Sequence, residues 1–472
     1  MEQVTIVMVP FTAQGHLNQL LHFAINLSST YVDLSVHYAS SASYIRQAKS
    51  RVQGRDPASL EKVHFHELPL APFPCTPLPD PASSFPSHLL LSLDAALRLT
   101  NPLAALFLSL STGCRRLIVV YDFAMSFVSP DVTSLPNAES YRFQCVPSHF
   151  DLHSLCHQPG FDASKLRREV LDVILDPFEG SLAPEVLDFL TRIYRDHIDA
   201  EVAGTLFNSC RPVEGEFLDL LSGVPWYRGK KVFAVGPLNP LAVERGLSSH
   251  KCLEWLDEQP PASVLYVSFG STSTMSDEQI EKLATGLERS GQRFIWVLRD
   301  ADLGDVFAAD GDGNNGIGRR ELPAGFEERV EGRGVVVRGW APQLPILAHP
   351  STGGFMSHCG WNSCMESLSM GVPIVAWPLH SDQPRNAAMV TEYLRTGVAV
   401  REWARHGDPV SSEAIEKAIG KVMVVLQCCD EEGKEMRKRA RLLGEAIRLS
   451  VAEGGSSRAD MDSFVQHITR DA

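Results

Sequence analysis

Short apolar runs alternate with longer amphipathic stretches along both halves of the chain. Short apolar runs bounded by turn residues predict strands, and the amphipathic stretches between them predict helices. In the N-terminal half we expect strands at residues 5–11, 33–39, 63–68, 116–123, 143–147 and 204–208. In the C-terminal half we expect strands at residues 264–269, 293–298, 335–338 and 374–377. The expected helices include residues 17–29, 277–290 and 361–370.

Buried strands separated by helices are typical of parallel sheets with right-handed crossovers. Two such sets predict an α/β protein of two doubly wound domains. A segment rich in Pro, Gly and Ser at 236–250 predicts the linker, so we expect an N-terminal domain over 1–240 and a C-terminal domain over 251–454. The proline-rich segment 69–86 and the Gly- and Asp-rich segment 300–320 predict surface loops.

Composition narrows the class of protein. The 472 residues are 44% hydrophobic and 21% charged, which is typical of a globular enzyme. A net charge of −14 argues against nucleic acid and anionic membranes as partners. The ten cysteines show no zinc-ligand spacing, so we expect reduced thiols in a cytoplasmic protein. No run of 18 apolar residues and no secretory leader is recognisable, so we expect no membrane span.

The most distinctive segment covers residues 340–383, WAPQLPILAHPSTGGFMSHCGWNSCMESLSMGVPIVAWPLHSDQ. It predicts a strand, glycines and then a helix that begins near Trp361, which is how α/β sheets present phosphate sites. Gly360 allows a close backbone approach, while His358, Asn362 and Ser363 offer side-chain donors at the helix N-terminus. Together these groups predict a cradle for a diphosphate.

Each residue of this segment also has a plain structural interpretation. Ser363 and Glu366 have the spacing of a capping box, so Glu366 could simply cap its own helix. Asn362 could be an N-cap and Trp340 a core residue. Asp382 and Gln383 precede a proline and could be turn residues. The recurrence of all these groups within one strand–helix–strand unit favours a binding site.

A second set of candidates lies at predicted strand ends in the N-terminal half. His16 follows the first strand in PFTAQGHLNQ, and Asp122 ends another strand in LIVVYDF. An aspartate that orients a histidine makes a general base. His16 could instead be a loop histidine and Asp122 a helix N-cap. Ser271 and Thr272, in FGST after a strand of the second half, are candidates for the phosphate side or an ordinary turn.

The segment 340–383 resembles the signature box of the plant family-1 UDP-glycosyltransferases at nearly every signature position. Cys364 and Met365 stand where Thr and Leu are more usual. The resemblance implies the GT-B fold, in which two Rossmann-like domains face a cleft and the last helix, here about 455–469, returns to the N-terminal domain. The matched positions are Trp340, Pro342, Gln343, His349, Gly354, His358, Cys359, Gly360, Trp361, Asn362, Ser363, Glu366, Gly371, Pro373, Trp377, Pro378, Asp382 and Gln383.

The same resemblance implies roles. Trp340 stacks on uracil, and Gln343 and Glu366 contact the nucleoside. His358, Asn362 and Ser363 hold the phosphates, while Trp361, Asp382 and Gln383 bind the sugar, with Gln at the last position going with glucose. Ala341, Gly360, Ser271 and Thr272 complete the expected donor site. His16 is the expected base and Asp122 its partner, and no metal or other cofactor is expected.

The N-terminal half resembles the zeatin O-glycosyltransferases, and the cis-zeatin type of grasses best, in VMVPFTAQGHLNQLLHF, LFNSCRPVEGEFLDLL, KVFAVGPLNPL and SFVSPDVTSLPNAESYRFQCV. The resemblance implies inverting transfer of glucose from UDP-glucose to a cytokinin side-chain hydroxyl, by a monomer. The expected acceptor pocket comprises Phe85, His88, Phe123, Met125 and Phe127. A phenolic or flavonoid acceptor, UDP-xylose as donor, and an epimerase or non-catalytic binding module remain alternatives.

Overall fold

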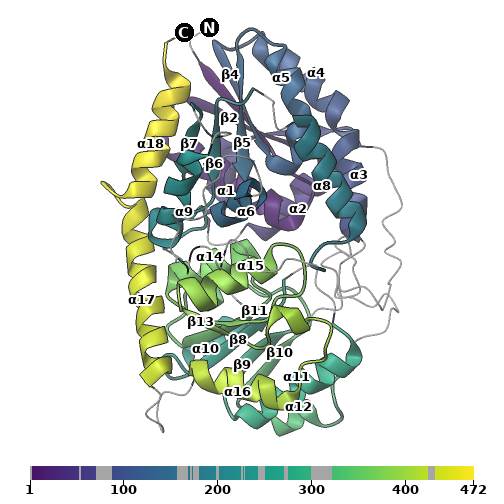
Figure 1. The fold of residues 1–472 in the computed structure, drawn as a ribbon, viewed down its shortest axis with the longest axis vertical. Helices are drawn as coiled ribbons and strands as arrows, with labels where there is room; N and C mark the ends of the chain where they lie inside the picture. The colour runs from purple at the N-terminus through teal and green to yellow at the C-terminus, as the bar shows by residue number, and fades with distance from the viewer. Residues whose placement is uncertain are drawn as a thin grey trace.

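The computed structural model describes two parallel sheets with helices on both faces (Figure 1). The described residues are 3–52, 55–70, 88–156, 168, 170, 173, 180–197, 201–224, 227, 229–242, 250–270, 275–298, 321–423 and 431–471. The predicted loops at 69–86 and 300–320 fall almost wholly outside these ranges. The predicted domain boundary within 236–250 also includes residues outside them, so its position stays a prediction.

The first sheet has seven strands in the order β3-β2-β1-β4-β5-β6-β7, all parallel. This order starts in the middle and winds outward in both directions, which is the doubly wound arrangement. Its central strands are buried on both faces, and β1 is buried at all six positions. The strands are β1 Val4–Val9, β2 Leu34–Ser41, β3 His64–Leu68, β4 Arg116–Asp122, β5 Ala138–Gln144, β6 Gly204–Phe207 and β7 Lys231–Ala234.

Helices and short helical turns connect these strands. The helix α1 begins shortly after β1, and the 3₁₀ turn η2 directly follows β4. The helical segments are α1 Gln14–Thr30, α2 Ala42–Arg51, η1 Pro57–Lys62, α3 His88–Arg98, α4 Thr100–Ser111, η2 Phe123–Val128, α5 Ser129–Thr133, α6 Ser148–Cys156, α8 Pro184–His197 and α9 Arg211–Gly223.

The second sheet has six strands in the order β10-β9-β8-β11-β12-β13, again all parallel. Its strands are β8 Val264–Ser268, β9 Arg293–Val297, β10 Gly334–Val337, β11 Thr352–Ser357, β12 Ile374–Ala376 and β13 Gly397–Ala399. Its helical segments are α10 Lys251–Asp257, α11 Asp277–Ser290, α12 Phe326–Arg329, α13 Gln343–Leu347, α14 Trp361–Met370, α15 Gln383–Ala388, η6 Met389–Tyr393, η7 Trp403–Arg405 and α16 Ser412–Met423.

Most predicted strands agree with the observed ones to within one or two residues at each end, but the prediction at 143–147 is wrong in its bounds. The strand β5 begins at Ala138, because charged residues inside it find buried partners and do not end it. Arg142 donates to the hydroxyl of Tyr227 at 2.8 Å and lies 3.3 Å from Asp151. The short strands β7 and β13 were not predicted.

Two long helices at the C-terminus join the two halves. The helix α17 (Glu431–Val451) packs against both α14 and α9, and α18 (Ser456–Thr469) packs against β7 (Figure 1). Asp460 accepts a hydrogen bond from the backbone N–H of Ala234 at 2.9 Å, and Phe464 is fully buried in the N-terminal core. The described chain therefore crosses from the second sheet back to the first.

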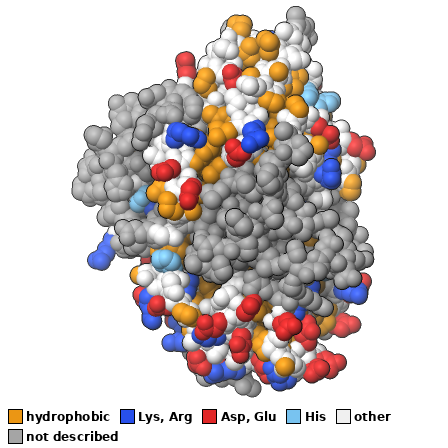
Figure 2. Space-filling model, turned by 90° about the vertical axis from the view of Figure 1, so that its right-hand side faces the viewer, with side chains coloured by type: hydrophobic (Ala, Val, Ile, Leu, Met, Phe, Trp, Pro, Cys, Tyr) orange, Lys and Arg blue, Asp and Glu red, His pale blue; other side chains and the backbone are white. Residues whose placement is uncertain are grey.

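Charges of both signs are interspersed on the molecular surface. Figure 2 shows acidic and basic side chains side by side over the lower half of one face, where the second sheet lies. Because the net charge is −14, a negatively charged ligand would have to be held by local groups and not by the overall field. Within the described residues, no helix is both long and apolar enough to cross a bilayer.

Candidate active site

The carboxyl ends of the two sheets meet at one cavity of about 290 Å³. Ligands of open α/β sheets bind at this end of the strands. From the first half the cavity is lined by Ala13, Gln14, Gly15, His16, Asn18, Gln19, Arg51, Cys145 and Val146. From the second half it is lined by Tyr266, Ser268, Gly270, Val297, Trp340, Ala341, Gln343, His358, Gly360, Trp361, Asn362, Ser363, Glu366, His380, Ser381, Asp382 and Gln383.

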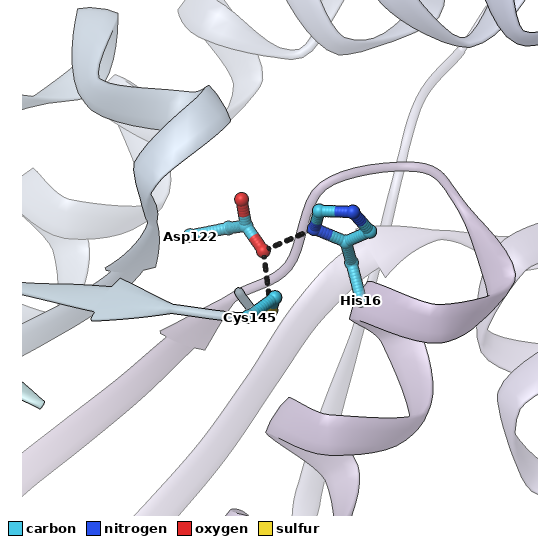
Figure 3. A group of neighbouring side chains, drawn as sticks. All are labelled: His16, Asp122 and Cys145. Carbon is cyan, nitrogen blue, oxygen red and sulfur yellow. Dashed lines mark hydrogen bonds and ion pairs between the residues drawn. The ribbon is translucent and has the colours of Figure 1, made fainter. Parts of the chain in front are cut away.

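His16 and Asp122 lie together on the N-terminal side, as the sequence predicted. His16 stands in the first turn of α1, and Asp122 is the last residue of β4, the strand beside β1. The ring Nδ1 of His16 lies 2.7 Å from Oδ2 of Asp122 (Figure 3). A carboxylate can only accept, so Nδ1 carries the hydrogen and Nε2 keeps its lone pair. The pair therefore has the geometry of a histidine base with an orienting aspartate.

The surroundings of this pair favour a base that is easily protonated. Burial lowers the pKa of His16, but the charge of Asp122 and the hydrogen bond to it outweigh burial and raise the pKa above its ordinary value. Asp122 is fully buried, and its other oxygen accepts from the backbone N–H of Ala124 at 2.9 Å. The helix-cap interpretation of Asp122 is thus also correct. One carboxylate oxygen caps η2 through Ala124, and the other contacts His16.

Cys145, which sequence reasoning missed, completes this cluster. It directly follows β5, and its thiol donates to Oδ2 of Asp122 at 2.9 Å, the same oxygen that His16 contacts (Figure 3). Burial and the nearby Asp122 carboxylate raise the pKa of the Cys145 thiol well above its ordinary value. The thiol is therefore a neutral hydrogen-bond donor at neutral pH.

On the wall that the second half contributes, the N-terminus of α14 and His358 lie together where the sequence predicted a diphosphate cradle. The helix begins at Trp361 after Gly360, and no side chain caps its free N–H groups. Burial lowers the pKa of His358 to about 4, so this imidazole is neutral at pH 7. A Cβ on Gly270 or Gly360 would lie 2.7 Å or 2.6 Å from His358 Nε2, and Gly270 also has a φ of +79°. Both glycines are therefore required to seat the ring.

Trp340, Gln343 and Glu366, the residues predicted to contact the nucleoside, all line the cavity. The Gln343 amide donates to Oε2 of Glu366 at 2.8 Å and to Oγ of Ser363 at 3.0 Å. The carboxylate of Glu366 thus accepts from the Gln343 side chain, and not from the backbone at Ser363 as a capping box would require. Burial raises the pKa of Glu366 to about 7, and the hydrogen bond from Gln343 opposes that rise. Trp340 is half-buried and lines the cavity, with Ala341 beside it.

Two residues at the start of α14 reach across to the first half. The Asn362 amide donates to the carbonyl of Gly15 at 2.9 Å, one residue before His16. The Trp361 indole N–H donates to the carbonyl of Asn208 at 2.8 Å, and its ring is buried in a cluster shared by both halves. These contacts fix the position of α14 relative to His16.

Asp382 and Gln383 lie at the start of α15, close to the His16 ring. Asp382 accepts from the Asn386 amide at 2.6 Å; burial raises its pKa, while Asn386 and the nearby His16 oppose the rise. Oε1 of Gln383 accepts from the backbone N–H groups of Leu379 and His380 at 2.9 and 3.0 Å. The Gln383 side chain is therefore fixed by its own turn, with its amide nitrogen beside His380.

The predicted acceptor residues are only partly described. The ring centroid of Phe123 lies 6.3 Å from that of His16, and Phe127 is partly buried. None of Phe123, Met125 and Phe127 is among the residues that line the cavity described above. Met125 is fully buried, because η2 turns it into the core. Phe85 and the His88 side chain lie outside the described residues, as do Ser271 and Thr272 of the donor prediction.

Polar groups on α1 and α2 add to the cavity wall beside the base. Gln14 Oε1 accepts from Arg51 Nη1 at 3.0 Å and from the Gln47 amide at 2.6 Å, and the Gln14 amide donates to Asn18 at 2.7 Å. Gln14 and Asn18 flank His16 in the PFTAQGHLNQ motif, so their position in sequence was a usable signal. Arg51 ends α2, and no sequence signal marked it.

Comparison with known proteins shows the family to which this chain belongs. The profile described as "Glycosyltransferase, N-terminal domain" matches residues 2–240, and that described as "UDP-glucoronosyl and UDP-glucosyl transferase" matches residues 248–424. The chain is 45% identical over 482 residues to cis-zeatin O-glucosyltransferase 1 of Zea mays, covering 100% of this chain and 99% of the relative. This chain belongs to the UDP-glycosyltransferase family.

Two further comparisons bear on this UDP-glycosyltransferase. It is 43% identical over 474 residues to zeatin O-xylosyltransferase of Phaseolus vulgaris, covering 99% of this chain and 98% of the relative. It is also similar in structure to Phytolacca americana UGT2 in complex with UDP-2-fluoro-glucose and pterostilbene, with a TM-score of 0.73, 26% identity and 99% coverage of both chains. The GT-B fold expected from the sequence is thereby confirmed.

Proposed function

We propose that this enzyme transfers glucose from UDP-glucose to the side-chain hydroxyl of zeatin, with inversion, to give a β-O-glucoside, and that it favours the cis isomer. The observation that carries the proposal is that His16, held by Asp122, and the free N-terminus of α14 line one cavity, to which the two halves of the chain contribute. A base on one wall and an anion cradle on the other suit a transfer that needs both groups.

His16 acts as the general base in this proposal. Its Nδ1–H is held by Asp122, so Nε2 is free to take the proton from an acceptor hydroxyl as that oxygen attacks the anomeric carbon. Asp122 then stabilises the imidazolium that forms. Because a single displacement occurs at the anomeric carbon, the α-linked sugar of the donor becomes a β-glycoside.

The donor binds on the second half. Trp340 stacks on the uracil, and Gln343 and Glu366 contact the nucleoside. The diphosphate lies at the N-terminus of α14, where free N–H groups and the positive end of the helix dipole favour negative charge. Neutral His358 donates a hydrogen bond there, together with Asn362 and Ser363.

The sugar faces α15 and the base. Trp361, Asp382 and Gln383 surround the place where the sugar would lie, and Asp382 is close enough to interact electrostatically with His16. A carboxylate and an amide suit several sugar hydroxyls at once, because one accepts and the other also donates. No metal is required, since helix N–H groups and side-chain donors supply the stabilisation of the leaving diphosphate.

The acceptor assignment rests on the relatives. Cis-zeatin O-glucosyltransferase 1 and zeatin O-xylosyltransferase match this chain over nearly its full length. The isomer preference follows from reach: cis and trans side chains place the hydroxyl in different directions from the same anchored ring. A misplacement of about 1 Å from the base can cost on the order of 10²-fold in rate.

UDP-xylose is a second candidate donor, favoured by the 43% identity to the xylosyltransferase. Xylose lacks the hydroxymethyl group of glucose, so the two donors differ only at the substituent on C5 of the sugar. A difference of one small group in the sugar gives only a modest ratio between the kcat/KM values for UDP-glucose and UDP-xylose.

A product assay tests the proposal. Purified enzyme is incubated with UDP-glucose, UDP-xylose or UDP-galactose and with cis-zeatin, trans-zeatin or a phenolic or flavonoid panel. We expect the highest kcat/KM for UDP-glucose with cis-zeatin. A clear trans preference refutes the isomer assignment, and glycosylation of phenols without either zeatin refutes the cytokinin assignment. Release of UDP that depends on the acceptor excludes both an epimerase and a non-catalytic binding module.

A further inference from the structure

Three ligand atoms of different chemistry converge beside the cavity. They are Nδ1 of His16, Oδ2 of Asp122 and Sγ of Cys145, which all lie within 4.8 Å of one another. They come from the start of α1 and the ends of β4 and β5, three segments that the parallel sheet brings side by side (Figure 3). Within the described ranges, no other group of three or more histidine, cysteine or acidic residues has ligand atoms this close.

The spacing of these atoms is close to that of a metal site. Oδ2 of Asp122 lies 2.7 Å from His16 Nδ1 and 2.9 Å from Cys145 Sγ. Tetrahedral zinc has bonds of about 2.0 to 2.3 Å, so its ligand atoms are about 3.3 to 3.7 Å apart. The cluster would have to widen by less than about 1 Å, which rotation of the two outer side chains can supply.

Access and rigidity also suit a cation. His16 is 24% exposed and lines the cavity together with Cys145, so an ion can arrive from the donor side. Asp122 is held from behind by the N–H of Ala124 at 2.9 Å, which fixes one ligand in place. A site with three protein ligands and one position open to the cavity is the arrangement of an exchangeable zinc site.

The donor set selects the class of cation. Nitrogen, oxygen and sulfur together favour zinc and other thiophilic divalent ions over magnesium or calcium, which prefer oxygen ligands alone. When such an ion binds, the thiol proton is released. The carboxylate and the thiolate then carry two negative charges, which balance the two positive charges of the ion in this buried place.

We propose that His16, Asp122 and Cys145 form an inhibitory binding site for a thiophilic divalent cation such as Zn²⁺. The inhibitory effect, though not the binding itself, rests on the proposed role of His16 as the base. The ion would occupy the space between the three side chains and would replace both hydrogen bonds to Oδ2 of Asp122.

Binding there switches off the base by a change of tautomer. A metal takes a lone pair of the imidazole, so the proton on His16 Nδ1 must leave that nitrogen. It moves to Nε2, which then has no lone pair for the acceptor hydroxyl. Asp122 is also withdrawn from the imidazole, so the transition-state imidazolium loses its partner. The cation therefore competes with the base without touching the diphosphate cradle.

Cadmium absorption tests binding directly, because a cadmium–thiolate bond absorbs in the near ultraviolet. The full-length protein is titrated with Cd²⁺ in a thiol-free reductant, and zeatin glucosylation is measured in parallel over a range of Zn²⁺ concentrations. The variants are Cys145→Ser, His16→Asn and Cys252→Ser. Cys252 lies on α10, is equally buried and does not line the cavity, so it is a matched control.

We expect about one equivalent of thiolate-bound Cd²⁺ in the wild type and in Cys252→Ser. The absorption should fall by about that one equivalent in Cys145→Ser relative to Cys252→Ser. His16→Asn should bind Cd²⁺ at this site at least tenfold more weakly, since losing even a group that merely orients a metal ligand costs about 10–100-fold. The inhibitory Zn²⁺ concentration should rise at least as much in Cys145→Ser.

Three results overturn the proposal. The first is cadmium–thiolate absorption in Cys145→Ser that equals the absorption of the wild type. The second is wild-type absorption that is unaffected in His16→Asn, a variant that keeps the thiol and so decides the matter if Cys145→Ser does not fold. The third is equal Zn²⁺ inhibition of wild type and Cys145→Ser. If the enzyme glucosylates no zeatin, the proposed function fails separately, and the absorption still decides the metal site.

Discussion

Replacing Asp122 by asparagine is expected to lower kcat by about 30- to 1,000-fold while leaving UDP binding intact. Asp122 uses both carboxylate oxygens: Oδ1 accepts from the N–H of Ala124, and Oδ2 accepts from His16 and Cys145. Asparagine has one oxygen and one amide nitrogen, so it can reproduce only one of these two arrangements at a time.

The magnitude follows from the two orientations of the new amide. If oxygen keeps the contact to Ala124, the amide N–H faces His16 Nδ1 and forces the proton to Nε2, so the base is lost. The other orientation restores the correct tautomer but forfeits the helix-cap hydrogen bond, at about 1–2 kcal/mol. A neutral partner also replaces a charged one at the imidazolium, at about 1–2 kcal/mol more. The sum of about 2–4 kcal/mol gives the expected range.

Single-turnover glucosylation at saturating UDP-glucose measures this loss, with calorimetric UDP binding and thermal unfolding as controls on Asp122→Asn. His16→Ala should lose about 10²–10⁴-fold. Because the two residues act as one unit, the double variant should be no slower than His16→Ala. Activity of Asp122→Asn within threefold of wild type, or losses that multiply in the double variant, would refute the reasoning.

Three other outcomes follow. EDTA should leave kcat unchanged, because helix N–H groups and His358 stabilise the diphosphate; inactivation that Mg²⁺ or Mn²⁺ reverses would contradict this. Gln383→Ala should lower the ratio of kcat/KM for UDP-glucose to that for UDP-xylose or UDP-galactose more than it weakens UDP binding, and an unchanged ratio would remove Gln383 from sugar selection. Glu366 has a pKa of about 7 and must be ionised to accept well from ribose hydroxyls, so its proton is released when the donor binds. UDP-glucose affinity measured by calorimetry should therefore rise from pH 6 to pH 8 in the wild type and stay flat in Glu366→Gln; parallel slopes would disprove the link.

Sequence reasoning predicted the contact of His16 with Asp122 and the helix start after Gly360 because both depend on local pattern. Strand ends and a helix start can be recognised from periodicity and glycine placement, and parallel strands bring their carboxyl ends to one edge. His16 and Asp122 are 106 residues apart in sequence, yet His16 begins the helix that follows β1 and Asp122 ends β4, the strand beside β1. Their contact is therefore one that the topology predicts.

The features that the sequence did not predict depend on how helices and strands pack against one another. The contact of Cys145 with Asp122 follows from the pairing of β4 with β5, and the sequence assigned β5 the wrong bounds. Arg51 reaches the cavity only because α2 packs beside α1. Met125 was misplaced because a short 3₁₀ turn, with no clear periodicity, decides which side chains face the core. Edge strands of three or four residues, such as β13, are too short for a pattern of alternation.

The most direct test of the proposed function is the structure of the product formed from UDP-glucose and cis-zeatin. The product is isolated after complete conversion, and its linkage and anomeric configuration are determined by NMR from the coupling of the anomeric proton and its correlation to the side-chain carbon. We predict a single β-glucoside on the side-chain oxygen. An α-glucoside, a ring-nitrogen glucoside or the absence of any zeatin product would contradict the proposed mechanism or the proposed acceptor.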